Sequence, residues 1–173
     1  MERLFSPWRS RYIATFKNEA PRSGESLFTR IIRERDDARN LVLQRRKTCM
    51  VMMNLYPYNS GHLMIVPYRQ LAGMQELTVA ENADIMNAAG EMIGVLTAVL
   101  KPHGFNFGAN LGRAAGAGVD DHIHFHIVPR WNGDTNFMPV LGEVKVVSEE
   151  MRSLYKKLKA AMKKRPTVLR RRK

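Results

Sequence analysis

The chain has 173 residues, which is enough for one domain with a sizeable hydrophobic core. Apolar residues make up 45% and charged residues 25%, as in ordinary soluble globular proteins, and no apolar run approaches the ~18 residues of a membrane span. Cys49 is the only cysteine, which excludes an intrachain disulfide and a cysteine-based zinc site. The opening residues lack the apolar core of a signal peptide, so we expect a cytoplasmic protein without a membrane partner.

The formal net charge of +12 is concentrated at one end of the chain. Residues 156–173 contain ten lysines and arginines and no acidic residue, so the remaining 155 residues carry only about +2. We interpret this end as a solvated basic extension. The alternative is non-specific contact with RNA, DNA or another anionic surface, although no nucleic-acid recognition motif accompanies the basic residues.

The first part of the chain, residues 1–25, is interpreted as an N-terminal arm with a short helix at Arg9–Phe16. Apolar residues at helical spacing then predict a helix over residues 26–35, with Ser26 as its N-cap. Short apolar runs bounded by turn-forming residues predict three strands, at Asn40–Gln44, Thr48–Leu55 and His62–Pro67.

A long helix is expected at Val79–Leu100, because apolar residues recur there at helical spacing. Glu81 falls in its first turn, where a carboxylate suits the helix dipole. The methionine-rich face of this helix serves either the core or an interface. Phe105–Leu111 is predicted to form the next strand.

The C-terminal part, residues 148–173, is expected to hold a basic helix, capped by Ser148 and ending near Lys164, and a basic tail. A short strand at Val144–Val147 is expected before it. Short antiparallel strands combined with a few helices indicate an α+β domain over residues 26–147.

Three histidines alternate with strongly apolar residues in the segment His122–Val128. A period of two predicts a strand with His122, His124 and His126 on one face and the apolar side chains on the core face. Neighbouring imidazoles on a strand lie roughly 6.5–7 Å apart along the chain, so all three are not expected to bind one metal ion. Structural histidines and a two-histidine metal site are alternatives, but clustered titratable groups favour a catalytic strand.

A glycine-rich turn, residues 112–118, leads into the histidines. Its three glycines permit backbone conformations that expose amide N–H groups, which is how proteins form concave anion sites without charged side chains. Imidazole is an effective nucleophile toward phosphorus, and a neighbouring histidine can stabilise the developing charge. The combination favours nucleotidyl transfer through a covalent histidine intermediate.

These residues resemble a known family. His122–Val128 is similar to the histidine triad motif, in which three histidines alternate with apolar residues. Asn54–Pro67 and Asn106–Gly118 resemble the strands and the turn that precede the triad in that family, so the resemblance covers roughly residues 26–131.

Within the family, Pro7–Tyr12 and Pro129–Pro139 resemble the branch of diadenosine polyphosphate phosphorylases and hydrolases. The resemblance implies an α+β histidine triad fold: a mostly antiparallel sheet of about five strands, a long helix packed on it, and a homodimer in which two sheets join. It also implies an enzyme that acts on the α-phosphate of adenine nucleotides, most of all diadenosine polyphosphates, and releases AMP or ADP according to whether water or inorganic phosphate is the acceptor.

The resemblance assigns roles to the histidines. His124 is implied to be the nucleophile that becomes adenylylated, and His126 to contact the α-phosphate and the leaving oxygen. His122 is implied to hold the active-site backbone, and His62 to give hydrogen-bonding support. The substrate-binding residues implied are Asn54 for ribose, Asn110 and the backbone amides of Gly116 and Gly118 for phosphate, and Phe28, Ile31 and Met52 for adenine.

Several positions depart from the family pattern. Many relatives have a Cys-x-x-Cys where this chain has Ser26 and Thr29, and a histidine where it has Gln70, so no structural zinc is expected. No tightly bound cofactor is implied, and Mg²⁺ is expected only in company with the polyphosphate. Two other functions remain open: a catalytically silent nucleotide-binding module, and a basic-tailed protein that acts on nucleotidylated nucleic-acid ends.

Overall fold

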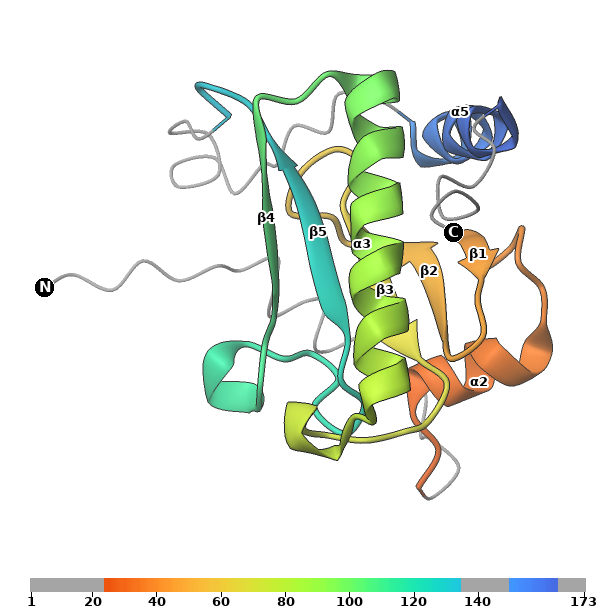
Figure 1. The fold of residues 1–173 in the computed structure, drawn as a ribbon, viewed down its shortest axis with the longest axis vertical. Coiled ribbons are helices and arrows are strands. Elements are labelled where there is room, and N and C mark those ends of the chain that lie inside the picture. Colours follow the sequence, from red (N-terminus) through yellow and green to blue (C-terminus); the bar gives the residue numbers. More distant parts are fainter. Residues whose placement is uncertain (1–23, 135–149, 165–173) are drawn as a thin grey trace, which may run out of the picture.

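The computed structural model describes residues 24–134 and 150–164. Its centre is one five-stranded antiparallel sheet, as the α+β expectation requires (Figure 1). The strand order is β1-β2-β3-β5-β4, so the strand that carries His126 is an inner strand and β4 lies at an edge. The strands are β1 (Val42–Arg45), β2 (Cys49–Met53), β3 (Leu63–Pro67), β4 (Gly104–Ala109) and β5 (Phe125–Arg130).

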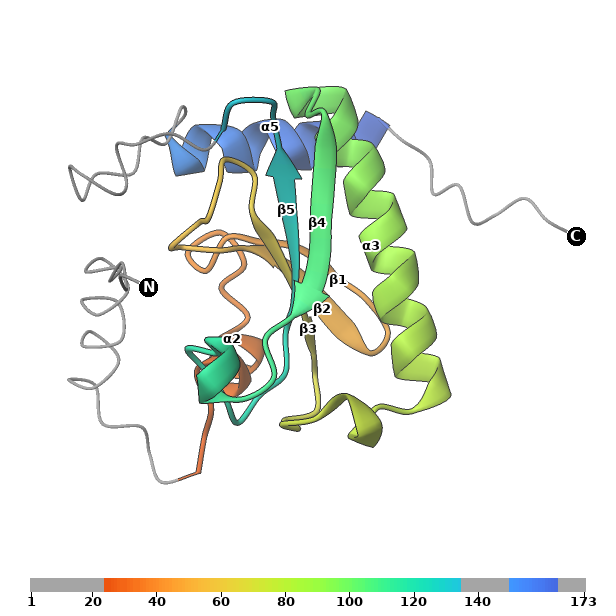
Figure 2. The same cartoon turned by 90° about the vertical axis from the view of Figure 1, so that its left-hand side faces the viewer.

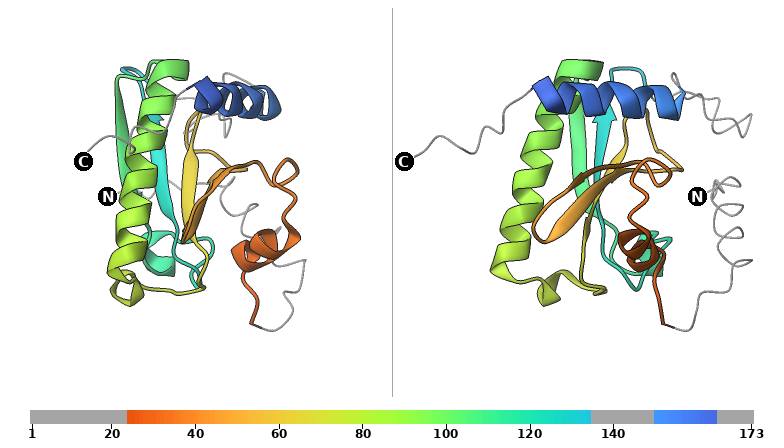
Figure 3. Two further views of the ribbon diagram at one scale, coloured as in Figure 1. Left: turned by 45° about the vertical axis from the view of Figure 1, so that its right-hand side comes forward. Right: turned by 90° about the vertical axis from the view of Figure 1, so that its right-hand side faces the viewer.

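Helices cover both faces of the sheet (Figures 2 and 3). The long helix α3 (Val79–Leu100) packs along one face, and α5 (Met151–Lys164) crosses near the C-terminal end of α3. The short helix α2 (Leu27–Glu34) lies on the opposite face. Two single 3-10 turns, η1 (Met74–Glu76) and η2 (Arg113–Ala115), complete the described elements.

The sheet separates two apolar clusters, because β2 and β3 are buried on both faces. The larger cluster lies under α3 and α5 and includes Ile123, Phe125 and Ile127. The smaller one lies under α2 and consists of Phe28, Ile31, Val42, Met50, Met52, Met64 and Val66. The alternation along the histidine segment therefore divides its side chains between the two faces, as expected.

Helix α3 has the bounds predicted from the sequence, because local signals define both of its ends. The Thr78 hydroxyl accepts from Glu81 N–H while the Glu81 carboxylate accepts from Thr78, forming a capping box. Val79 and Met86, although apolar, are 87% and 59% exposed, and the core stripe runs through Ile85 and Met92 instead. By length and composition alone α3 would suffice for a membrane span, but it is packed on the sheet as a core helix.

The histidine segment differs from the expected strand, since β5 begins at Phe125 and not at His122. The reason is a change of hydrogen-bond partner: Ile123 N–H donates to the Leu71 carbonyl at 2.7 Å, and pairing with β3 starts only where Ile65 faces Phe125. His122 and His124 therefore lie in an extended segment that leads into the strand.

Other boundaries shift by a few residues. Arg45, which follows the strand expected at Asn40–Gln44, is the last residue of β1 and faces Met50 of β2. Helix α5 ends at Lys164 as expected, and the Glu150 carboxylate accepts from the N–H groups of its first turn. The helix expected at Arg9–Phe16, the strand at Val144–Val147 and the cap Ser148 lie outside the described residues.

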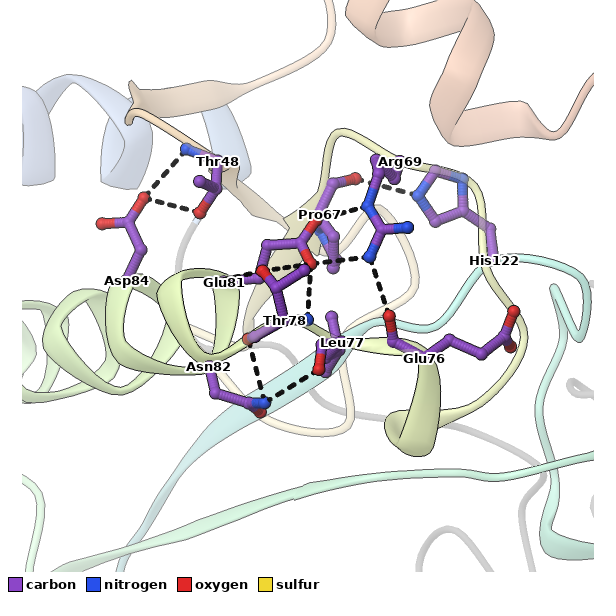
Figure 4. A network of polar contacts seen from close by, with 10 residues as sticks. All are labelled: Thr48, Pro67, Arg69, Glu76, Leu77, Thr78, Glu81, Asn82, Asp84 and His122. Atoms are coloured by element: carbon purple, nitrogen blue, oxygen red, sulfur yellow. Dashed lines mark hydrogen bonds and ion pairs between the residues drawn. The ribbon is translucent and has the colours of Figure 1, made fainter.

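Arg46 joins the β1–β2 turn to α3. Its guanidinium donates to Asp84 and to Glu91, each at 2.7 Å, and its side chain is 13% exposed. Asp84 also accepts from the backbone N–H and the hydroxyl of Thr48 (Figure 4). One side chain thus satisfies two carboxylates that would otherwise face each other along the helix.

We expect Arg46→Met to lower the free energy of unfolding by about 2 kcal/mol, since it leaves two carboxylates without their cation in a partly buried place. Urea denaturation measures the change. Arg113→Met is the matched control, because the Arg113–Asp120 pair is exposed and should contribute nothing measurable. Equal stability of both variants would contradict the assigned role of Arg46.

Candidate active site

The three histidines of the segment all point to the α2 face of the sheet and are buried, with exposed fractions of 0%, 7% and 8% for His122, His124 and His126. The ring of Phe28, from α2, lies against the first two, with centroid distances of 5.5 Å to His122 and 4.9 Å to His124. His62, just before β3, lies against His126 with a centroid distance of 5.0 Å. Four imidazoles therefore share one buried layer.

His122 is held by hydrogen bonds at both ring nitrogens. Its Nε2 lies 2.9 Å from the Pro67 carbonyl oxygen, which only accepts, so Nε2 carries the proton (Figure 4). Its Nδ1 lies 2.7 Å from the Ser26 hydroxyl, which must then donate. Burial lowers the pKa of His122, in keeping with this neutral form.

His124 has the opposite tautomer. Its Nδ1 is 3.0 Å from the carbonyl oxygen of His122, so Nδ1 donates and Nε2 keeps its lone pair. Burial lowers the pKa of His124 more than the bond to the carbonyl raises it. A neutral imidazole with an unprotonated Nε2 is the form that attacks an electrophile.

His126 is oriented from the other side by His62. Tyr58 N–H donates to Nδ1 of His62 at 3.0 Å, so Nε2 of His62 carries the proton and donates to Nδ1 of His126 at 2.9 Å. His126 then carries its own proton on Nε2. Its ring centroid is 4.9 Å from that of His124, closer than strand spacing alone suggested, and the two ring planes meet at 77°. A nucleophilic nitrogen and a donor nitrogen therefore lie on neighbouring rings.

The expected binding residues are placed around this layer. Phe28, Ile31 and Met52 are buried together in the α2-side cluster. Asn54 is buried beside His62: its Nδ2 is 3.4 Å from the Nδ1 of His62, and its Oδ1 accepts from Tyr56 N–H at 2.9 Å. The geometry thus gives Asn54 a part in holding the turn before β3 that the sequence did not indicate.

The glycine-rich turn contains η2 and leads into the histidine segment. Gly112 and Gly116 adopt positive φ values of 77° and 92°, as a turn that needs glycine requires. Nδ2 of Asn110 donates to the Gly116 carbonyl at 3.4 Å, so this side chain supports the turn. Gly118 lies in the same turn, just before the segment that contains His122.

Within residues 24–134 and 150–164, no group of three or more His, Cys, Asp or Glu side chains is arranged to hold a metal ion. Burial is the main reason that the pKa of Cys49 is raised to about 12, which keeps this thiol protonated and unsuited to metal binding. Ser26, Thr29 and Gln70, the positions that the resemblance compared with zinc ligands, form a hydrogen-bonded group beside His122.

Comparison with known proteins agrees with this geometry. A family model described as "HIT domain" matches residues 35–133. The AP-4-A phosphorylase of Mycobacterium tuberculosis is 42% identical over 156 residues, which cover 88% of this chain and 80% of that protein. The chain therefore belongs to the histidine triad family, the class that its sheet and buried histidines define.

More distant similarity is found both in sequence and in structure. The asymmetrical bis(5'-nucleosyl)-tetraphosphatase of Schizosaccharomyces pombe is 31% identical over 93 residues, which cover 54% of this chain and 50% of that protein. A zinc-bound histidine triad family protein from Mycobacterium smegmatis superposes with a TM-score of 0.66 at 21% identity, covering 81% of this chain and 94% of that chain.

Since burial lowers the pKa of His124, an NMR titration of the folded protein should give a pKa below the ordinary 6.5, and the urea-unfolded chain should give the ordinary value. The unfolded chain then binds a proton at higher pH than the folded one. His124 therefore makes its full contribution to stability above pH 6.5, and this contribution is lost as the pH falls from 6.5 through the lower pKa of the folded state. A folded-state pKa at or above 6.5 would contradict the buried neutral form.

Proposed function

We propose that the protein is a nucleotidyl transferase that cleaves diadenosine polyphosphates at an α-phosphorus through an adenylyl-His124 intermediate. The observation that carries the proposal is the pair of tautomers: an unprotonated Nε2 on His124 and a proton-bearing Nε2 on the adjacent ring of His126. The relationship to proteins named AP-4-A phosphorylase and bis(5'-nucleosyl)-tetraphosphatase supports this substrate class.

In the first step, the lone pair on Nε2 of His124 attacks the α-phosphorus. An N–P bond forms and the bond from phosphorus to the bridging oxygen breaks, so that diadenosine tetraphosphate releases ATP. His126 Nε2–H donates to the oxygens that gain charge. The positive charge that develops on His124 is stabilised at Nδ1–H by the carbonyl oxygen of His122.

In the second step, an acceptor oxygen attacks the same phosphorus and the N–P bond breaks, which returns His124 to its neutral form. Water as acceptor gives AMP, and inorganic phosphate gives ADP. The proposed binding residues are Phe28, Ile31 and Met52 for adenine, Asn54 for ribose, and Asn110 with the backbone amide of Gly118 for phosphate. The amide of Gly116, which the sequence also assigned to phosphate, instead donates to the Arg113 carbonyl at 2.9 Å within the η2 turn. No resident cofactor is needed, and any Mg²⁺ binds with the polyphosphate.

Product analysis with diadenosine tetraphosphate tests the function. We expect AMP and ATP without inorganic phosphate, and ADP together with ATP once millimolar phosphate competes with water. His124→Ala should abolish turnover with the fold intact, and His126→Ala should lower kcat by about 10²–10³-fold, as for the loss of one charge-stabilising donor.

Two results would contradict the proposal. Near-normal turnover by His124→Ala would exclude this residue as the nucleophile. Absence of turnover by the wild-type protein on every dinucleoside polyphosphate would favour a nucleotide-binding module without catalytic activity. Formation of AMP and ATP without ADP at millimolar phosphate would leave the histidine mechanism in place and assign the enzyme to the hydrolases.

We also propose that the protein forms a homodimer in which two β4 strands join the sheets. β4 is a six-residue edge strand without a charged residue or a proline, so it lacks the usual protection of an exposed edge. Phe107 is 38% exposed on this strand, with its ring stacked on Phe125 at 5.9 Å. An apolar edge of this kind suits pairing with a second copy.

Phe107→Lys should convert the dimer to a monomer, because it places two charges at the joint between copies. Analytical ultracentrifugation measures the mass. Met74→Lys is the control, since Met74 is similarly exposed, at 45%, but lies in η1, away from β4. A Phe107→Lys protein that stays dimeric would place the interface elsewhere.

A further inference from the structure

Ser26 serves two elements at once. As the N-cap of α2, its hydroxyl oxygen accepts from Thr29 N–H at 3.2 Å. The same oxygen is 2.7 Å from Nδ1 of His122, which lies 96 residues further along the chain, and Ser26 is only 4% exposed. A helix cap needs only an acceptor, so the contact with His122 calls for a separate explanation.

The direction of the hydrogen bond between Ser26 and His122 follows from the partners of both residues. Because His122 donates from Nε2 to the Pro67 carbonyl, its Nδ1 accepts, and the Ser26 hydroxyl is the donor. Thr29 cannot compete for that role, since its own hydroxyl donates to Oε1 of Gln70 at 2.9 Å.

Gln70 anchors the group at its outer end. Its Oε1 also accepts from Ser26 N–H at 3.2 Å, while its Nε2 donates to the Gly24 carbonyl at 3.2 Å and to Asp121 Oδ2 at 3.0 Å. One amide therefore connects the loop after β3, the start of α2 and the residue that precedes His122. The orientation of the Gln70 amide is fixed because its Oε1 faces two donors and its Nε2 faces two acceptors.

We propose that Ser26, supported by Thr29 and Gln70, is a positioning residue for the nucleophile, a role that rests on the function proposed above. The Ser26 hydroxyl keeps His122 in the Nε2–H form and fixes its ring between Ser26 and Pro67. The carbonyl oxygen of His122 is then held where it accepts from Nδ1 of His124, which leaves the attacking Nε2 unprotonated. The path from Gln70 to the reacting nitrogen runs through three hydrogen bonds, which are joined by the covalent bonds of Ser26, His122 and the His124 ring.

Two substitutions at one position separate helix capping from donation to His122. Ser26→Asp keeps an excellent cap but has only acceptors, so it should favour the doubly protonated His122. Ser26→Thr keeps both the cap and the donor. We expect kcat for diadenosine tetraphosphate to fall by about 10–100-fold in Ser26→Asp with KM within threefold, and to stay within about threefold of wild type in Ser26→Thr.

A variant of the exposed Gln70, which does not endanger the fold, gives a second measurement. Gln70→Met should lower kcat by about 3–10-fold at unchanged KM, because Ser26 and Thr29 lose their shared acceptor. The proposal is overturned if Ser26→Asp keeps kcat within threefold of wild type, or if Ser26→Thr loses as much as Ser26→Asp.

Nitrogen-15 NMR of the imidazoles tests the same proposal without substrate. The wild-type protein should show His122 as the neutral Nε2–H tautomer and His124 as the Nδ1–H tautomer, and Ser26→Asp should keep His122 doubly protonated to higher pH. Unchanged histidine spectra in Ser26→Asp would overturn the positioning role even in an active enzyme. The expected change in a protein that does not turn over dinucleotides would support that role and reject only the proposed function.

Discussion

The hydrogen bond between His122 and the Pro67 carbonyl oxygen determines the chemistry of the site. A carbonyl oxygen only accepts, so this one contact places the proton of His122 on Nε2 and leaves its Nδ1 to accept from Ser26. Pro67 is itself fixed by its pairing with Cys49 at the end of β3. The end of β3 therefore determines which ring nitrogen of His122 carries the proton. The carbonyl oxygen of His122 in turn determines which ring nitrogen of His124 carries it.

The two faces of the sheet divide stability and chemistry between them. The α3 face holds the larger apolar cluster and the Arg46 bridge, which need no part in the reaction. The α2 face holds the buried imidazoles, whose neutral forms depend on the low polarity around them. Ile123 and Phe125 are packed in the larger cluster, and this packing fixes the backbone of the histidine segment. The side chains of the alternating histidines lie outside that cluster, on the other face.

The sequence predicted what depends on local patterns. The bounds of α3 were predicted from the helical spacing of its apolar residues and from Glu81 in its first turn, and the structure adds the capping box that Glu81 forms with the N-cap Thr78. The common face of the three histidines follows from their alternation, which an extended chain preserves whether or not it pairs with a neighbour. The N-cap role of Ser26 was likewise predicted from its place before an apolar helix.

What the sequence did not predict depends on partners far along the chain. The start of β5 moved to Phe125 because Ile123 pairs with Leu71, and no pattern in the histidine segment encodes that choice. The second bond of Ser26 and the tautomer that Tyr58 imposes on His62 are equally non-local. The sequence predicted that the histidines share one face, but the positions of their protons required the folded backbone.

The central claim is that Nε2 of His124 carries the adenylyl group during turnover. The most direct measurement is rapid mixing of the protein with diadenosine tetraphosphate, an alkaline quench within milliseconds, and mass-spectrometric mapping of the modified peptide. The account predicts one AMP unit on His124, linked through Nε2, with a matching burst of ATP. Turnover without any covalent adduct, or an adduct on His126 or on another residue, would contradict it.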